Sequence, residues 1–261
     1  MMKTIFKVCA AVFLAATAMA PAAQAKTMKV AFGAEPYPPM YFPDASGKWQ
    51  GFEIELADVV CKAAGLQCET VPIAWDGIIP ALTSGKVDMI MGSMSITEER
   101  KKRVDFSDVY YKIPPMIIGA KDAKFDVTPE GMADKAIGVQ VSTIHQAYVD
   151  KYYVPKGATL KEYQTQDEAN NDLAAGRLDA VMADSSALSD FLNTEVGKSC
   201  CESKGTPAND VGILGQGVGV AIRKGEDDLR EKLNAAIKTI RKNGEYDRVA
   251  KKYFTVDVFG Q

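Results

Sequence analysis

Residues 53–73 read EIELADVVCKAAGLQCETVPI, a pattern that indicates a helix, a turn and a strand in close succession. The apolar side chains of the first part recur at spacings of three, four and three residues, which places them on one face of a helix. These residues are Ile54, Ala57, Cys61 and Ala64. A helix with one apolar stripe packs on a sheet, and the glycine that follows supplies its stop. The stretch therefore predicts one unit of an α/β fold.

The same alternation continues on both sides of this stretch. A first set has expected strands at 28–32, 69–73 and 88–91 and expected helices at 53–64 and 77–84. A second set has expected strands at 136–140, 160–163 and 178–183 and expected helices at 144–152 and 166–175. Two further helices are expected at 227–242 and 245–253. Because strands and helices take turns in both sets, we predict two α/β lobes.

Two extended segments separate these sets. The first, 110–118, contains Pro114 and Pro115, which forbid a helix. After the second set, a polar, glycine-rich stretch at 200–205 leads to an extended apolar segment at 211–222. We interpret the two extended segments as crossovers between the lobes, with the last helices rejoining the first lobe. The predicted boundaries are 26–112 with 216–261 for lobe 1 and 113–215 for lobe 2.

The N-terminus has the features of a secretory signal peptide. Lys3 and Lys7 precede an apolar run, Val8–Met19, which is too short to span a membrane. Small residues at 23 and 25 fit cleavage before Lys26. We therefore predict that residues 1–25 are removed and that the mature protein is soluble and periplasmic. A buried N-terminal helix is the alternative.

Charge argues against a nucleic-acid partner. The formal net charge of the chain is −3, and the loss of Lys3 and Lys7 with the signal peptide makes it −5. The longest basic run, 100–103, is flanked by acidic residues and reads as a solvated helix face.

Four cysteines remain after the predicted cleavage, in a compartment that favours disulfides. Cys61 and Cys68 enclose a short turn, and a bridge between them would contribute about 2–3 kcal/mol in the chain-entropy model. Cys200 and Cys201 are adjacent, so a strained ring, two free thiols and intermolecular pairing all stay open. Neither pair has the usual spacing of zinc ligands, and we expect no metal and no cofactor.

Residues 92–100 have the sequence GSMSITEER, which we interpret as a carboxylate-binding cradle. Thr97 has the position of a helix N-cap, with Arg100 just inside the helix. Backbone N–H groups, the hydroxyls of Ser93 and Ser95 and one guanidinium can then converge on an anion. The alternative is a capped helix with a surface arginine.

The whole mature chain resembles the periplasmic amino-acid-binding proteins of ABC importers, and most of all those for lysine/arginine/ornithine, histidine and opines. The order and spacing of several short pieces carry the resemblance. These are Tyr37-Pro38-Pro39, Gly51–Leu56, Trp75–Leu82, Ser95–Arg100, Val139-Gln140, Gly176–Ala180 and Tyr246–Phe254. The Cys61/Cys68 pair also resembles the disulfide of the basic amino-acid binders.

The resemblance implies the type II two-lobe fold, with two crossover strands and a ligand enclosed between the lobes. Arg100 would bind the α-carboxylate, together with Ser95 and the backbone near Thr143. Asp184 would pair with the α-ammonium, to which Ser93 would make a further polar contact. An N-cap role for Asp184 in a helix from residue 185 is a compatible alternative.

The resemblance also implies the surroundings of the ligand side chain. Tyr37 and Trp75 would sandwich it, with lobe core as their alternative role. The other expected contacts come from the cradle and the second lobe: Gly92, Gln140, Ile144 and His145. For the lone histidine, a solvated or capping side chain is the alternative.

Two positions depart from the relatives. Ile144 stands where many of them have a polar residue, so the far end of the pocket is expected to be more apolar or larger. The second departure bears on basic specificity. The basic amino-acid binders carry an acid three residues before the cleft tyrosine, where this chain has Ala34, with Glu35 one position nearer. Glu35 would supply the missing carboxylate if the loop is rearranged, or it would turn outward. An opine or glutamine then fits better than a basic amino acid.

We therefore expect a periplasmic receptor that captures a polar, basic amino acid or a related opine and delivers it to the membrane permease subunits of an ABC importer. No catalysis and no partner chain are needed, so a monomer is expected. The competing hypothesis is a dehydratase of the same fold that acts on a prephenate-like or arogenate-like acid. A sensory module of a membrane receptor is disfavoured, because no membrane span follows Phe254.

Overall fold

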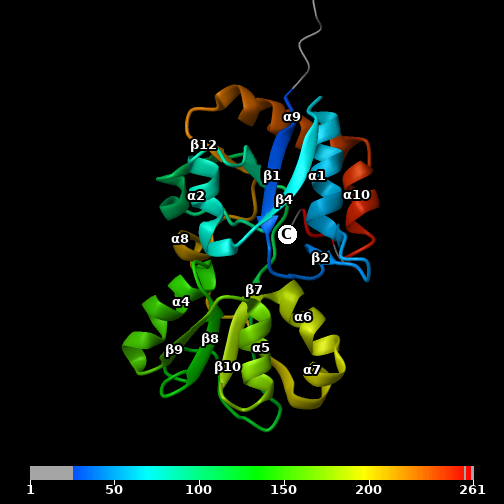
Figure 1. Ribbon diagram of the computed structural model, residues 1–261. Helices are drawn as coiled ribbons and strands as arrows, with labels where there is room; N and C mark the ends of the chain where they lie inside the picture. Colours follow the sequence, from blue (N-terminus) through cyan, green and yellow to red (C-terminus); the bar gives the residue numbers. More distant parts are fainter. Residues whose placement is uncertain (1–25, 256, 260–261) are drawn as a thin grey trace, which may run out of the picture.

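The computed structural model describes residues 26–255 and 257–259, which form two α/β lobes (Figure 1). The predicted signal peptide, residues 1–25, lies outside the described residues. The predicted alternation of strands and helices is confirmed in both lobes.

The first lobe contains a five-stranded sheet in the order β4-β1-β5-β12-β6. Its strands are β1 (Met28–Gly33), β4 (Cys68–Ile73), β5 (Met89–Ile90), β6 (Val104–Phe106) and β12 (Ala221–Arg223). β1 runs parallel to β4 and β5, whereas β12 is antiparallel to β5 and β6. A strand from the last fifth of the chain thus completes a sheet that begins near residue 28.

Helices cover both faces of this sheet. They are α1 (Phe52–Ala63), the 3-10 turn η1 (Trp75–Gly77), α2 (Ile78–Thr83), α3 (Glu98–Lys101), α9 (Asp227–Lys242) and α10 (Glu245–Ala250). Val30 and Phe32 pack into the core under α1, α9 and α10, while Ala31 faces the core under α2. This period of two is what a strand buried on both faces requires. A short hairpin, β2 (Phe42–Pro43) with β3 (Trp49–Gln50), lies beside α1.

The second lobe repeats the arrangement with the sheet order β11-β7-β10-β8-β9. Its strands are β7 (Pro115–Ala120), β8 (Ala136–Gln140), β9 (Thr159–Tyr163), β10 (Ala180–Asp184) and β11 (Cys201–Gly205). Its helices are α4 (Ile144–Tyr152), η2 (Val154–Lys156), α5 (Gln166–Ala174), α6 (Ser185–Asn193), α7 (Glu195–Cys200) and α8 (Val211–Leu214). Ile117 and Ile118 point into separate cores on opposite faces of the sheet.

The two connections between the lobes run side by side. Val218 pairs with Tyr111, and the backbone N–H of Tyr110 donates to the Val218 carbonyl at 2.9 Å. Such paired crossovers can act as a hinge, because a few residues absorb the rotation of a whole lobe. The domain boundaries given by the sequence stay a prediction. The assignment of β12 to the sheet of the first lobe is in agreement with them.

Two segments differ from the sequence expectation. Residues 201–205 form strand β11, which pairs with β7, instead of an irregular stretch. Residues 211–214 form the short helix α8 instead of extended chain, since the Asp210 side chain accepts from the Gly212 N–H and caps the turn. Both outcomes depend on partners that local apolar patterns do not reveal.

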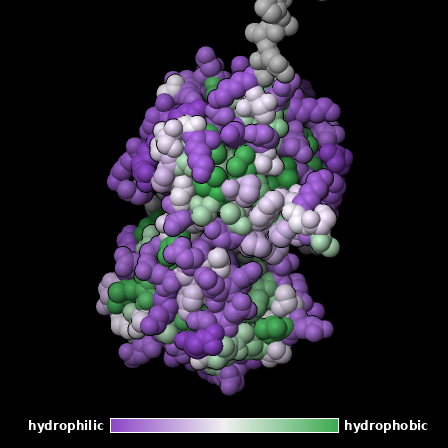
Figure 2. All heavy atoms as spheres, in the orientation of Figure 1, coloured by the Kyte–Doolittle hydropathy of each residue, from purple (hydrophilic) through white to green (hydrophobic). Residues whose placement is uncertain are grey.

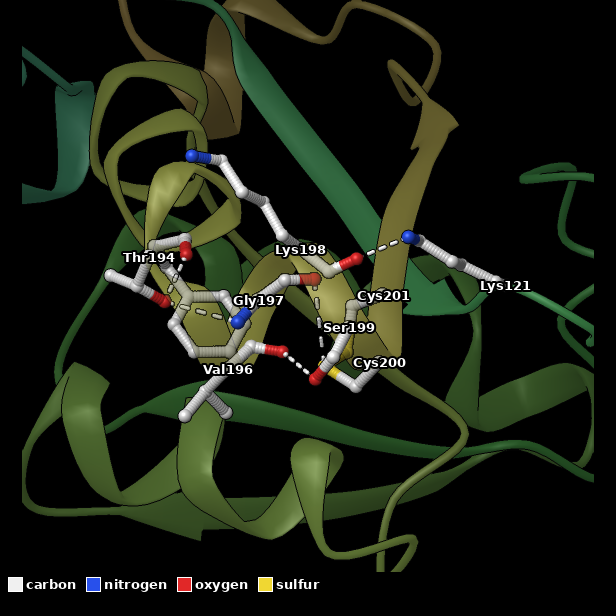
Figure 3. Close-up of a disulfide and its surroundings, with 9 residues drawn as sticks. Lys121, Thr194, Val196, Gly197, Lys198, Ser199, Cys200 and Cys201 are labelled. Atoms are coloured by element: carbon white, nitrogen blue, oxygen red, sulfur yellow. Dashed lines mark hydrogen bonds between the residues drawn. A yellow bond between two sulfur atoms is a disulfide. The ribbon is translucent and has the colours of Figure 1, made fainter.

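Two disulfides occur in the described part of the chain. One joins Cys61 at the end of α1 to Cys68 at the start of β4. The other joins the adjacent Cys200 and Cys201, one of the three possibilities left open by the sequence. Figure 3 shows this second pair where α7 ends and β11 begins, with Lys121 Nζ donating to the Lys198 carbonyl. The Lys121 backbone N–H, just after β7, donates to the Cys200 carbonyl at 3.0 Å.

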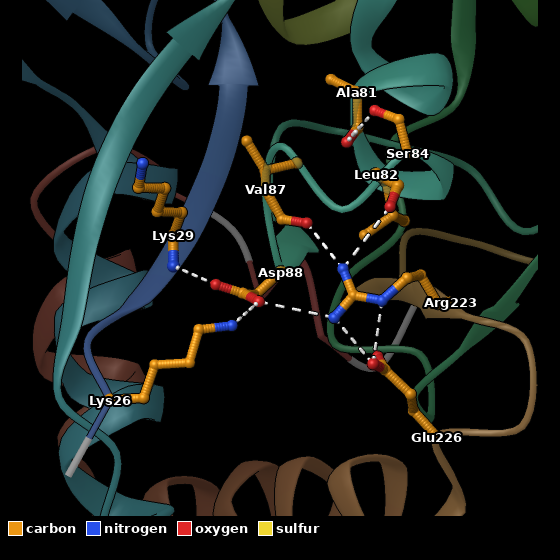
Figure 4. A network of polar contacts seen from close by, with 9 residues as sticks. All are labelled: Lys26, Lys29, Ala81, Leu82, Ser84, Val87, Asp88, Arg223 and Glu226. Carbon is orange, nitrogen blue, oxygen red and sulfur yellow. Dashed lines mark hydrogen bonds and ion pairs between the residues drawn. The ribbon is translucent and has the colours of Figure 1, made fainter.

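A buried carboxylate ties the start of the described chain to β12 (Figure 4). Asp88 accepts from Lys26 Nζ at 2.6 Å and from the Lys29 N–H at 2.9 Å, and it lies 3.4 Å from Arg223 Nη2. Burial works against these contacts, but the hydrogen bonds prevail and lower the pKa of Asp88. The network lies at the amino ends of β1 and β5, the opposite end of the sheet from its carboxyl-end loops.

The visible surface is mainly hydrophilic, and its apolar residues form small separate groups (Figure 2). Within the described residues, no helix combines the length and apolar character needed to cross a membrane.

Candidate functional site

A cavity lies between the lobes, where the carboxyl-end loops of the two sheets face each other. Its volume is about 30 Å³. Its lining comprises Tyr37, Tyr41, Trp75, Gly92, Ser93, Ser95, Arg100, Gln140, Thr143, Ile144, His145, Gln166 and Asp184. Loops at the carboxyl ends of parallel strands are the usual place for a ligand in α/β folds.

Three hydrogen bonds join the lobes across this cavity. Tyr37 Oη donates to Asp184 Oδ2 at 3.0 Å. Trp75 Nε1 and Arg100 Nη2 donate to the Ser142 carbonyl at 3.2 and 3.4 Å. The structure therefore shows the lobes in contact, with a small space enclosed between them.

Arg100 is held at the start of α3. Thr97 caps this helix, as predicted, by accepting from the Arg100 N–H at 3.2 Å. The guanidinium donates to the Ser95 carbonyl at 3.0 Å and lies 5.6 Å from the centroid of the Trp75 ring. Burial lowers the pKa of Arg100 to about 10, while Asp184 acts in the opposite direction. The group stays cationic at neutral pH and can bind an anion.

Asp184 ends β10 and lies opposite, on the second lobe. It has the N-cap position of α6, but its side chain makes no capping hydrogen bond. Its carboxylate instead accepts from Tyr37 Oη and lies 3.3 Å from His145 Nε2. The Tyr37 hydroxyl keeps its proton, because burial and then the Asp184 charge raise its pKa well above 10. The carboxylate is thus oriented toward the cavity and available to a ligand cation.

His145 is buried, with 5% of its surface exposed, so the alternative of a solvated side chain is wrong. Its Nε2 meets no hydrogen-bond geometry with any atom of the described chain, despite its short distance to Asp184. A buried, unsatisfied imidazole nitrogen that lines a cavity is suited to meet a ligand.

Ser93 and Gly92 follow β5 in an unusual conformation. Ser93 has φ 58°, in the left-handed region, and its N–H donates to Glu53 Oε1 at 2.7 Å. A Cβ on Gly92 would lie 3.1 Å from the Phe32 Cα, closer than most real contacts. Glycine at 92 therefore lets the turn after β5 pack closely against Phe32 of β1, and Ser93, the next residue, lines the cavity.

On the second lobe, Thr143 and Gln140 are fixed by local hydrogen bonds. Thr143 caps α4 by accepting from the Gln146 N–H at 3.1 Å, and its hydroxyl donates to the Gln140 carbonyl at 2.7 Å. Gln140 Nε2 donates to the Gln164 carbonyl at 2.9 Å. Ile144 adds the apolar part of the lining.

The aromatic residues form the first-lobe wall. Tyr37 and Trp75 are both 9% exposed. The Tyr37 ring stacks on Tyr41 with centroids 5.8 Å apart, and the guanidinium of Arg100 covers the Trp75 ring. Their contact with a ligand stays a prediction.

Glu35 is the one predicted ligand contact absent from the lining of this cavity. Its Oε1 accepts from the Trp75 backbone N–H at 3.4 Å, which places the carboxylate behind the Trp75 loop. Its contact with a ligand stays a prediction.

Two residues of the lining were not predicted. Tyr41 pairs with Tyr37 through the tight turn around residues 38–39, and Gln166 is the first residue of α5, after the carboxyl end of β9. The position of Gln166 beside a strand end is a signal that could have revealed it.

A second, larger cavity, with a volume of about 490 Å³, adjoins the first along the crossovers. It shares Ser95, Ile144 and Asp184 with the first cavity, and Lys112 and Gln216 are among its polar lining.

Two α/β lobes joined by paired crossovers around one cleft define the type II fold of periplasmic binding proteins. Residues 28–256 match the bacterial extracellular solute-binding proteins, family 3. The chain belongs to this family, which confirms the resemblance seen in the sequence.

Similar proteins and a similar solved structure support this family assignment. The L-arginine-binding protein of Pseudomonas aeruginosa is 40% identical over 225 residues, which cover 86% of each chain. The histidine-binding periplasmic protein of Salmonella typhimurium is 37% identical and covers 89% of this chain and 90% of its own. A solved ancestral amino acid-binding protein, described as a precursor of cyclohexadienyl dehydratase, has a TM-score of 0.75 and 34% identity, with 88% of this chain and 95% of its own covered.

Proposed function

We propose that this protein captures a basic amino acid between its lobes and delivers it to the membrane subunits of an ABC importer. The observation that carries this proposal is the placement of Arg100 and Asp184, a cation from the first lobe and an anion from the second, around one cavity. An amino acid carries a carboxylate and an ammonium on the same carbon, so one ligand can pair with both. Such a ligand links the lobes and favours the closed form.

The lining favours a long or cationic side chain. Tyr37 and Tyr41 line the cavity with aromatic surface that suits an aliphatic stem or a cation, and His145 offers a further polar contact. The relatives named above for arginine and histidine support the same class of ligand.

A larger ligand, such as an opine, is the alternative within this function. The neighbouring cavity shares Asp184, so a substituent on the ligand nitrogen could extend past this carboxylate toward Lys112. An acidic substituent would suit that cation.

We further propose that the protein binds without catalysis. A dehydratase needs a general acid or base beside the reacting carbon. Glu35 lies outside the cavity lining, and His145 lies against Asp184, which the proposal assigns to the ligand ammonium. Prephenate or arogenate incubated with the protein is expected to remain unchanged; conversion above the uncatalysed rate would favour the enzyme.

Family membership supports export, and we propose that residues 1–25 direct the protein to the periplasm, where it acts as a monomer. A ligand held by both lobes needs no second chain. The closed pair of lobes would then present one surface to the permease subunits.

A thermal-shift screen tests the proposed function. Arginine, ornithine, lysine and histidine should raise the melting temperature, because a ligand that binds only the folded state stabilises it. Octopine, nopaline and glutamine test the opine and neutral alternatives, and prephenate tests the enzyme. A clear preference for glutamate or an aliphatic amino acid would contradict the basic specificity.

Trp75→Phe is expected to weaken ligand binding by about 1 kcal/mol, mostly through faster dissociation. The phenyl ring keeps an aromatic face but cannot donate to the Ser142 carbonyl on the other lobe. This hydrogen bond exists only when the lobes are closed, so its loss should shorten the lifetime of the closed complex. Stopped-flow displacement of bound arginine measures the dissociation rate.

Trp49→Phe is the matched control for this variant. Trp49 lies in β3 and packs edge-on against Phe32, outside the cavity lining. Its replacement should leave the dissociation rate unchanged, and an equal effect of both variants would refute the interlobe role of Trp75.

Glu35→Gln should change the affinity for arginine by less than about threefold, since a glutamine Oε1 can still accept from the Trp75 N–H. Calorimetry with arginine and with neutral glutamine as ligands measures both affinities. A loss of about 1–3 kcal/mol for arginine alone would instead make Glu35 the missing carboxylate of the basic binders.

A further inference from the structure

A buried carboxylate, Glu53, lies directly behind the ligand cavity without lining it. Glu53 is in the first turn of α1 and has no exposed surface. Its oxygens accept from the Ser93 N–H at 2.7 Å, from Tyr111 Oη at 2.7 Å and from Tyr110 Oη at 2.9 and 3.0 Å. Burial raises the pKa of Glu53, and the hydrogen bonds from Tyr111, Ser93 and Tyr110 act in the opposite direction.

The contacts of Tyr111 set the direction of a chain of hydrogen bonds. Tyr111 Oη lies 2.7 Å from Glu53 Oε1 and 2.7 Å from Ser93 Oγ, but a phenol has only one proton to donate. Burial and then the Glu53 charge raise the pKa of Tyr111 well above 10, so that proton is retained. The oxygen that Tyr111 meets, Glu53 Oε1, already accepts from the Ser93 N–H, the role of an oxygen that carries no proton. Tyr111 therefore donates to Glu53, and the Ser93 hydroxyl must donate to Tyr111.

Because the Ser93 hydroxyl donates to Tyr111, it can act only as a hydrogen-bond acceptor at the cavity wall. The single proton of the Ser93 hydroxyl points away from the cavity, toward Tyr111, and only lone pairs remain for a ligand. The backbone of Ser93 cannot turn to change this, because its own N–H is held by Glu53 in the left-handed conformation.

We propose that Glu53 and Tyr111 are positioning residues that fix the Ser93 hydroxyl as a hydrogen-bond acceptor, so that the site selects a ligand with a donor, an ammonium, at this point. The inference rests on the proposed function and adds a selectivity to it. Asp184, the other group for the ammonium, is also an acceptor. A ligand ammonium has three protons and can donate to both acceptors. A ligand hydroxyl has one proton and can donate to only one of them, so its oxygen repels the oxygen of the other acceptor.

The test compares L-arginine with its 2-hydroxy analogue, 2-hydroxy-5-guanidinopentanoate, by calorimetry. The wild-type protein should prefer arginine by about 100-fold or more. Tyr111→Phe frees the Ser93 proton, which can then turn toward the ligand and donate to the hydroxyl oxygen of the analogue. The ratio of the two affinities should fall by about tenfold.

Tyr110→Phe is the matched control. Tyr110 is also fully buried and also donates to Glu53, but it makes no hydrogen bond to Ser93. Its loss should lower the melting temperature about as much as Tyr111→Phe while keeping the affinity ratio within about twofold of wild type. If the hydrogen bonds to Glu53 had only a structural role, Tyr110→Phe and Tyr111→Phe would change the ratio of the two affinities equally. That result would overturn the inference.

A second variant covers the case in which Tyr111→Phe does not fold. Ser93→Ala removes the acceptor itself and should also lower the ratio about tenfold, whereas an unchanged ratio would overturn the proposal. Failure of the wild-type protein to bind either compound would contradict the proposed function instead, so the two failures are distinguishable.

Discussion

Arg100→Ala is expected to weaken amino-acid binding by about 3–5 kcal/mol, because the ligand carboxylate would be enclosed without its charge partner. The fold should survive, since the hydrogen bonds of the guanidinium within residues 26–255 go to the Ser95 and Ser142 carbonyls at the cavity and not into a lobe core. Calorimetric titration of the purified variant measures the loss, with circular dichroism as the check on folding.

Two further variants make this test specific. Arg100→Lys keeps the charge but loses the planar fork, and it should restore only part of the affinity. Arg103→Ala removes an exposed arginine just after the same helix, outside the lining of the ligand cavity, and should leave binding unchanged. A loss below about 1 kcal/mol for a folded Arg100→Ala protein would exclude this residue from the carboxylate site.

Asp184→Ala should have an effect of the same size, about 3–5 kcal/mol, because it leaves the ligand ammonium desolvated and without its anion. The variant also frees the hydroxyl of Tyr37 and leaves His145 without its acidic neighbour. Calorimetry at one pH with the same ligand compares it directly with Arg100→Ala.

Asp190→Ala is the control for this change, since Asp190 lies exposed on α6, the helix that Asp184 precedes. It should bind the ligand like wild type. An Asp184→Ala protein with near wild-type affinity would show that another group, such as His145 or Ser93, holds the ammonium.

The local pattern of apolar residues was sufficient to predict most of the elements. Helices 144–152 and 227–242 begin and end where the sequence placed them, because each has an apolar stripe and a clear stop. Strand β8 also matches its expected range, 136–140. Parallel, doubly covered strands read as short apolar runs, which makes them visible in a single sequence.

The elements that were missed depend on distant partners. β11 is polar, with only Cys201 fully buried, and it is a strand because it lies at the sheet edge beside β7. The helix α8 has only four residues and depends on the Asp210 cap, and the apolar segment around it is typical of an extended chain. No period of two or of 3.6 residues could show either one.

The candidate site was predicted from strand ends and from family resemblance together. The cradle at 92–100 and Asp184 lie at the carboxyl ends of strands, so their convergence on one cleft could be expected. The direction of Glu35 and the contribution of Tyr41 depend on the loop around residues 34–41, whose geometry is set by contacts with the Trp75 loop. The hydrogen bonds between the lobes, such as that from Trp75 to Ser142, join residues 67 positions apart and have no local signal.

Calorimetric titration of the mature protein with L-arginine and with agmatine, its decarboxylated form, tests the central claim most directly. Both compounds have the same guanidinium and stem, but agmatine lacks the α-carboxylate that Arg100 is proposed to bind. We expect arginine to bind with a dissociation constant near or below micromolar and agmatine to bind at least about 100-fold more weakly. Equal affinity for the two compounds, or no binding of arginine, ornithine, lysine or histidine, would contradict the account.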